Sequence, residues 1–136
     1  RSRGLGDVYK RQLTVEENIS LPCDLDGNRP DKERMDLILK SFGLFERRNH
    51  LPNELSGGQQ QRTSIARALI NNPAILLADE PTGNLDSKST EEIMSILKMS
   101  NRDFNQTIIM ITHNLEIAKE ADRIITIQDG KILREA

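Results

Sequence analysis

Two short apolar runs constrain the fold of this chain more than any other feature. Residues 74–79 and residues 107–112 are nearly continuous apolar stretches, and Pro81 prevents the first from continuing. Runs of this length without polar alternation are typical of strands buried on both faces of a parallel sheet. Helical patterns precede and separate them, so the sequence predicts an α/β fold with a helical segment in front of the sheet.

The helical segments are marked by apolar spacing and by their first residues. Thr14 precedes Glu17 by three positions, and Ser56 precedes Gln59 by three, so each pair predicts a capping box at the start of a helix. Gly43 is expected to end the helix that begins near residue 31. The residues expected to face the core from the successive helices are Met35, Ile38, Leu39 and Phe42, then Ile65, Ala68 and Leu69, then Ile93, Ile96 and Leu97.

Turn residues punctuate the remaining chain. Residues 21–30 contain two prolines, a glycine and an asparagine, which favours a loop. Residues 71–73 end the helix before the first strand, and a short helix is expected over residues 114–121. Asp129 and Gly130 lie between two apolar segments, residues 123–128 and 131–134, and predict a β-hairpin with a two-residue turn.

Composition excludes several classes of protein. The 136 residues include 19 Lys or Arg and 21 Asp or Glu, so there is no excess of basic residues for binding nucleic acid. The apolar runs are too short to cross a bilayer, so any membrane role is expected to be peripheral. The single cysteine, Cys23, cannot form an internal disulfide, which fits a reducing compartment.

Residues 1–12 have no helical or strand periodicity and are interpreted as foreign to the fold. The codons of an adapter used in transposase-based sequencing libraries translate as residues 2–12 without a mismatch. A disordered basic N-terminus is the alternative. On the adapter interpretation, residues 1–12 are disordered, the natural protein continues upstream of Leu13, and this chain is a C-terminal fragment.

The first candidate site lies at the start of a helix. Ser56 is placed to cap it, while Gly57 and Gly58 leave room for an anion to approach backbone N–H groups that have no acceptor inside the helix. Gln59 completes the capping box. An ordinary capped helix after a glycine turn is the alternative interpretation.

The second candidate site follows the two strands. Asp79 and Glu80 end the first run, at the carboxyl end of a strand, where open α/β sheets bind ligands. Asp79 suits a water-mediated hold on Mg²⁺, and Glu80 can orient or deprotonate an attacking water. His113 follows the second run, so parallel pairing of the strands would bring it to the same edge. Asp86 alone would be a residue that starts a helix.

These four elements together resemble the nucleotide-binding subunits of ATP-binding cassette (ABC) transporters in order and spacing, over essentially all of residues 13–136. The resemblance implies a P-loop NTPase-type fold, divided into a helical subdomain over residues 13–73 and the C-terminal part of the ATPase core over residues 74–136. It also implies ATP and Mg²⁺ as ligands, a head-to-tail homodimer or pseudo-dimer, and an integral-membrane permease as partner. The site would then lie at the cytoplasmic face of the inner or plasma membrane.

The same resemblance implies a role for each site residue. Ser56, Gly57, Gly58 and Gln59 form the signature that contacts the γ-phosphate of ATP held by the partner. Asp79 is the Mg²⁺-side aspartate at the end of the strand, and Glu80 is the general base. Asp86 is the aspartate of the D-loop, and His113 is the switch histidine that bonds the γ-phosphate.

The chain also departs from the family pattern. It contains no G-x-x-x-x-G-K-[ST] loop, so the lysine and the backbone cradle that would hold the phosphates are absent from it. Gln12 directly precedes the segment Leu13-Thr14-Val15, too close to be the glutamine of the family's Q-loop. Tyr9 is not taken as the aromatic residue that stacks on adenine. The chain alone is therefore expected to be inactive.

Residues 13–19 and 78–86 resemble one ABC group in particular, which includes lipoprotein-releasing, macrolide-exporting and antimicrobial-peptide-resistance systems. The cell-division ATPase belongs to the same group, so signalling across the membrane without transport is an alternative function. A non-catalytic interaction fragment is another. DNA-repair ABC proteins are disfavoured, because the segment before Ser56 is too short for their coiled-coil or zinc insertions.

Overall fold

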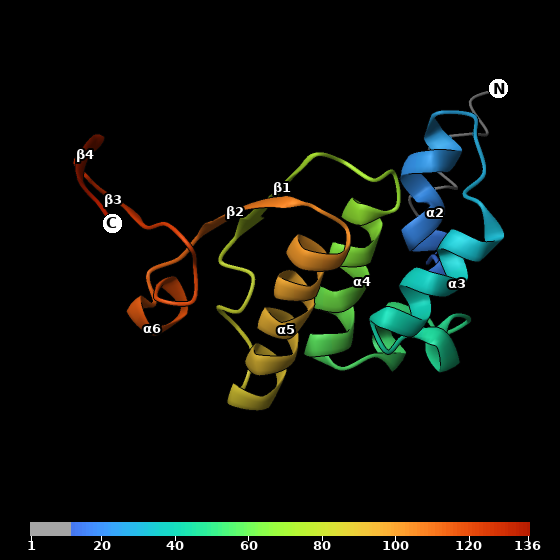
Figure 1. Cartoon of the computed structure of the whole chain (residues 1–136). Coiled ribbons are helices and arrows are strands. Elements are labelled where there is room, and N and C mark those ends of the chain that lie inside the picture. The colour runs from blue at the N-terminus through green and yellow to red at the C-terminus, as the bar shows by residue number, and fades with distance from the viewer. Residues whose placement is uncertain (1–11) are drawn as a thin grey trace, which may run out of the picture.

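The computed structural model describes residues 12–136, and they form the α/β arrangement that the sequence predicts (Figure 1). The interpretation of residues 1–12 therefore falls almost wholly outside the described residues. The helices are α2 (Val15–Leu25), α3 (Lys32–Ser41), α4 (Gly57–Leu69), α5 (Ser87–Asp103) and α6 (Leu115–Ala118), with 3₁₀ turns η1 (Phe45–Arg47) and η2 (Pro52–Glu54). The strands are β1 (Ile75–Asp79), β2 (Thr107–Ile111), β3 (Ile125–Gln128) and β4 (Lys131–Glu135).

The strands form two separate pairs. β1 and β2 are parallel, with Ile75 opposite Thr107 and Asp79 opposite Ile111, and α5 connects them. β3 and β4 form the predicted antiparallel hairpin. Asp129 and Gly130 both have positive φ, 50° and 73°, as a two-residue hairpin turn requires.

The parallel pair is covered on one face only. Figure 1 shows α4 and α5 side by side beneath β1 and β2, where Leu76 is buried. The other face carries apolar side chains that are half exposed or more: Ile75, Leu77, Ile109 and Ile111. The prediction of burial on both faces is therefore wrong for the part of the chain described here, because its helices supply only one of the two covering layers.

The apolar core joins α5 to the helices that precede the sheet. α2 packs against α4, and Ile19 and Leu69 are fully buried. All four residues predicted to face inward from α3 are buried, and Gly43 ends that helix with φ of 64°. The sequence prediction is wrong for one core residue of α4, because Ala68 is exposed and Ala66 is buried instead. The predicted inward residues of α5 are all buried.

The predicted loop over residues 21–30 begins too early. Helix α2 continues to Leu25 and contains Pro22. Proline is unfavourable inside a helix because it has no N–H to donate to the carbonyl one turn earlier. Here Ile19 and Cys23 lie one turn apart, both buried, so packing of this face outweighs the local preference.

No helix among residues 12–136 is both long and apolar enough to cross a membrane.

Candidate functional site

The carboxyl ends of β1 and β2 bring Glu80 and His113 together. The backbone N–H of Glu80 donates to the carbonyl of Ile111 at 2.9 Å, which extends the strand pairing by one residue. The backbone N–H of His113 donates to Oε1 of Glu80 at 2.8 Å, and the ring Nε2 of His113 lies 3.5 Å from the same oxygen. The predicted proximity of the two residues is confirmed, and their chemical roles stay predictions.

The backbone of Glu80 is in the left-handed region, with φ of 46°. This conformation is uncommon for residues other than glycine, asparagine and aspartate, and it costs about 1 kcal/mol or more. The carbonyl of Glu80 accepts a hydrogen bond from the N–H of Gly83 at 3.1 Å, which closes a turn immediately after the strand. Sequence reasoning missed this strain, since glutamate gives no signal for a positive φ.

The edge is open to solvent. The His113 side chain is 97% exposed, the Glu80 side chain is one-third exposed, and Asp79 is also exposed. No group of three or more metal-ligating side chains occurs within residues 12–136. An exposed carboxylate such as Asp79 still fits Mg²⁺, which keeps several waters and takes its remaining ligands from phosphates.

The start of α4 has the predicted capping box. The backbone N–H of Gln59 donates to Oγ of Ser56 at 3.1 Å, and the N–H of Ser56 donates to Oε1 of Gln59 at 2.9 Å. The N–H groups of the first helical turn, including those of Gly57 and Gly58, have no acceptor within the helix. This end of α4 is therefore suited to an anion.

Asp86 caps the neighbouring helix. Its Oδ1 accepts from the N–H of Ser89 at 2.8 Å, as its predicted position at a helix start requires. This backbone hydrogen bond and one from the Ser89 side chain lower the pKa of the Asp86 carboxyl.

The start of α4 lies against the start of α5. A β-carbon placed on Gly57 would have Leu85 Cδ2 as a neighbour at 3.6 Å, and one placed on Gly58 would meet Ser89. The candidate site residues thus form two groups in this chain, one of Ser56 to Gln59 with Asp86 and the other of Asp79, Glu80 and His113.

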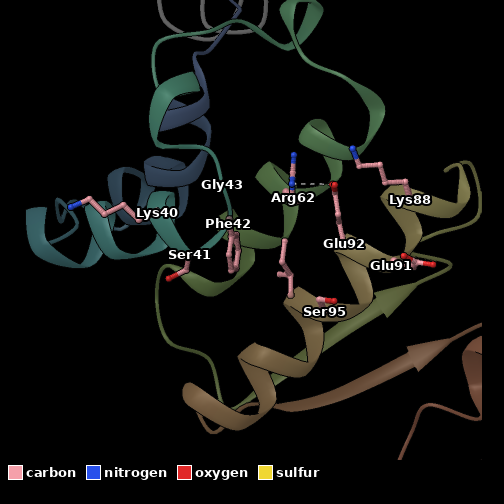
Figure 2. Close-up of a pocket in the computed structure, with 10 residues that line it drawn as sticks. Lys40, Ser41, Phe42, Gly43, Arg62, Lys88, Glu91, Glu92 and Ser95 are labelled. Atoms are coloured by element: carbon pink, nitrogen blue, oxygen red, sulfur yellow. Dashed lines mark hydrogen bonds and ion pairs between the residues drawn. The ribbon is translucent and has the colours of Figure 1, made fainter.

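A surface depression lies elsewhere, between the end of α3, α4 and α5 (Figure 2). It has a volume of about 570 Å³, and none of the predicted site residues lines it. Nη1 of Arg62 on α4 bonds Oε2 of Glu92 on α5 at 3.1 Å across its wall. The depression marks the seam between these two helices and is not the candidate site.

The chain matches a known protein family in its sequence. A family model described as "ABC transporter" matches residues 5–83, more than half of the chain. The chain belongs to the ABC transporter family. Its fold agrees with that assignment, since it is similar to a dimeric structure of the ATP-binding cassette MJ0796 in a post-hydrolysis state bound to ADP and Pi. The TM-score is 0.75 at 45% identity, over 91% of this chain and 56% of that one.

Relatives with curated names include both separate ATP-binding subunits and larger proteins of the ABC transporter family. The chain is 52% identical over 125 residues to an uncharacterized ABC transporter ATP-binding protein, MJ1508, of Methanocaldococcus jannaschii, covering 90% of this chain and 55% of the relative. It is 48% identical over 138 residues to the macrolide export ATP-binding/permease protein MacB of Pasteurella multocida, covering 96% of this chain and 21% of the relative. The chain thus spans about half the length of the separate subunit and a smaller share of the fused protein.

Proposed function

We propose that the full-length protein is the ATPase subunit of an ABC transporter that powers export or extraction through a partner permease. The observation that carries this proposal is the pairing of Glu80 with His113 at the carboxyl edge of a parallel sheet, 2.8 Å from backbone N–H to carboxylate. Family membership and the similarity to a cassette bound to ADP and Pi support it.

Glu80 acts as the general base in this proposal. Its carboxylate accepts a proton from the attacking water while the oxygen of that water bonds to the γ-phosphorus and the bond to ADP breaks. The backbone N–H of His113 fixes one carboxylate oxygen, which leaves the second oxygen for the water. The exposed ring of His113 is free to reach a phosphate oxygen.

Mg²⁺ would be held on the side of Asp79, through water. When bound, the ion neutralises charge on the phosphates. Asp79 is the last residue of β1, so its carboxylate lies beside the candidate base in the sequence and at the same edge of the sheet.

The active protein is a dimer of nucleotide-binding subunits in this proposal, with Ser56 to Gln59 of one subunit facing the γ-phosphate bound by the other. The open first turn of α4 supports an anion contact at this place. Relatives of known structure are described as dimeric. Residues 13–73 serve as the helical subdomain and residues 74–136 as part of the ATPase core, at the cytoplasmic face of the membrane.

The permease contact is assigned to the helical subdomain. Four apolar residues of this segment are candidates for the contact: Leu21, Pro22, Leu25 and Phe45. Leu25 is the most available of them, with 79% of its surface exposed at the end of α2. Leu21 and Pro22 are partly buried beside it. Phe45 is partly buried and stacks against Lys40 and Arg48, so it is a weaker candidate. A cysteine at Leu25 should crosslink to a cytoplasmic loop of the permease in the assembled complex.

The test of the proposed function compares the full-length protein with residues 13–136 alone. The full-length protein should release phosphate from ATP with Mg²⁺ present, whereas residues 13–136 should not, because they contain no phosphate loop. Absence of ATP hydrolysis by the full-length protein would refute the function. Hydrolysis by residues 13–136 at a comparable rate would refute the division of labour between the phosphate loop and the signature.

A further inference from the structure

The two glycines at the start of α4 have different surroundings. Gly57 is exposed, and a β-carbon there would have its nearest neighbour, Leu85 Cδ2, at an ordinary contact distance of 3.6 Å. Gly58 is buried, and a β-carbon there would lie 2.9 Å from Oγ of Ser89 and 3.2 Å from its Cβ. Carbon atoms in contact prefer separations of about 3.5–4.0 Å. A side chain at residue 58 would thus force Ser89 on α5 to shift, while the chain itself leaves room at residue 57.

Ser89 occupies the space that a side chain on Gly58 would fill. Its own backbone N–H donates to Oδ1 of Asp86 at 2.8 Å. Ser89 therefore lies against the buried glycine of the signature with its side chain and holds the carboxylate of Asp86 with its backbone N–H.

The contact lies at the beginning of a seam between two helices that run in the same direction. Gly58 lies against Ser89 at the start of the two helices. About one turn further along, Arg62 bonds Glu92, and Figure 2 shows this pair. Arg62 is mostly buried, with 16% of its side chain exposed. The ion pair links the two helices about one turn beyond the Ser89 contact, which lies at their first turns.

We infer that Ser89 is a positioning residue for the signature: it holds Gly58, and with it the first turn of α4, in register with Asp86. The inference rests on the proposed function, in which Ser56 to Gln59 and Asp86 both serve the nucleotide at the subunit interface. Ser89 touches neither substrate nor reacting atoms. In the proposed dimer, the signature contacts the nucleotide bound by the other subunit. Loss of the Ser89 side chain should therefore lower kcat and leave the KM for ATP unchanged.

The functional test uses the full-length protein and two matched serine variants. Ser89→Ala removes the hydroxyl, and Ser87→Ala removes an exposed hydroxyl from the same helical turn as a control. A misplacement of about 1 Å can cost about a hundredfold in rate, and loss of one supporting contact should cost less. We expect Ser89→Ala to lower kcat about five- to twentyfold with KM within about twofold of wild type, as measured by steady-state phosphate release. Ser89→Thr, which keeps the hydroxyl, should restore at least about half of the lost kcat.

A second arm tests the contact without relying on activity. Gly58→Ala should lower the Tm, and adding Ser89→Gly should recover part of that loss, giving a favourable coupling in a double-mutant cycle. Additive effects on Tm would overturn the packing contact.

The kinetic outcomes distinguish failure of this inference from failure of the proposed function. An active wild type with Ser89→Ala equal to Ser87→Ala would overturn the positioning role alone. That role would also be overturned if Ser89→Ala raised KM without lowering kcat, or if Ser89→Thr were as impaired as Ser89→Ala. A full-length wild type that does not hydrolyse ATP would overturn the proposed function and this inference with it.

Discussion

The carboxylate of Glu80 is held by the backbone N–H of His113, at 2.8 Å, and its contact with the His113 ring is longer, at 3.5 Å. Mutation of His113 can therefore remove the ring contact with Glu80 while the backbone hydrogen bond remains. The backbone bond survives any substitution that preserves the end of β2. The ring is solvent-exposed and available for another partner.

Substitution Glu80→Gln should abolish most ATP hydrolysis by the full-length protein. The amide keeps the size of the side chain and can still accept from His113, but it cannot take a proton from water. Loss of a general base typically costs about a hundred- to ten-thousandfold in rate. Phosphate release measures the loss, and size-exclusion chromatography with ATP should show a trapped dimer. Glu33→Gln, at an exposed residue of α3, should keep the wild-type rate.

Substitution His113→Ala should lower ATP hydrolysis without unfolding the protein. The side chain is almost fully exposed, so its removal leaves no cavity, and the backbone N–H still holds Glu80. We expect a Tm within about 2 °C of wild type and a clear loss of kcat. A variant as active as wild type would exclude the ring from the mechanism.

Substitution Arg48→Ala should destabilise the packing of α2 and α3. The guanidinium bonds both oxygens of Glu16 on α2, at 3.0 and 2.9 Å, lies 3.2 Å from Asp36 on α3, and stacks on Phe45. Hydrogen bonds to charged groups contribute about 1.5–3 kcal/mol each at most, and partial exposure reduces this, so a loss of about 1–3 kcal/mol in unfolding free energy is expected. Urea denaturation measures it. Arg47→Ala, at the exposed neighbouring position, is the control and should change little.

The stability that Asp86 adds should depend on pH. Hydrogen bonds from Ser89 lower the pKa of this carboxyl in the folded state, so the ionised form is favoured by folding. The contribution is present above the ordinary aspartate pKa of about 3.9 and disappears as the pH falls through the lower folded value. Thermal melts should therefore show Asp86→Ala below wild type in Tm at pH 7, with the difference shrinking at acid pH. A constant difference would contradict this cap.

The Cys23 thiol should react slowly with alkylating reagents in the folded protein. It is buried, its Sγ lies 2.8 Å from Oδ1 of Asn71, and burial raises the pKa of the thiol. Less thiolate is thus available to attack a reagent. A thiol assay with and without urea checks this, and equal rates would show that α2 opens readily.

Features that depend on local pattern are predictable from this sequence, and those that distant packing decides are not. The Ser56–Gln59 capping box and the Asp129–Gly130 turn are encoded within a few residues, and both are confirmed. Pro22 favours a loop on local grounds, because the benefit of burying Ile19 and Cys23 against α4 cannot be read from residues 21–30. The contact of Gly58 with Ser89 joins two helices about 30 residues apart, and no spacing rule reports it.

The left-handed backbone of Glu80 has a consequence for protein engineering. A substitution to glycine or asparagine there would relieve conformational strain, and a search guided by thermostability alone would favour it. The gain in stability would remove the carboxylate that is proposed to accept the proton. Stabilising libraries for this protein should therefore keep Glu80 fixed and draw their changes from the exposed surfaces of α3 and α5.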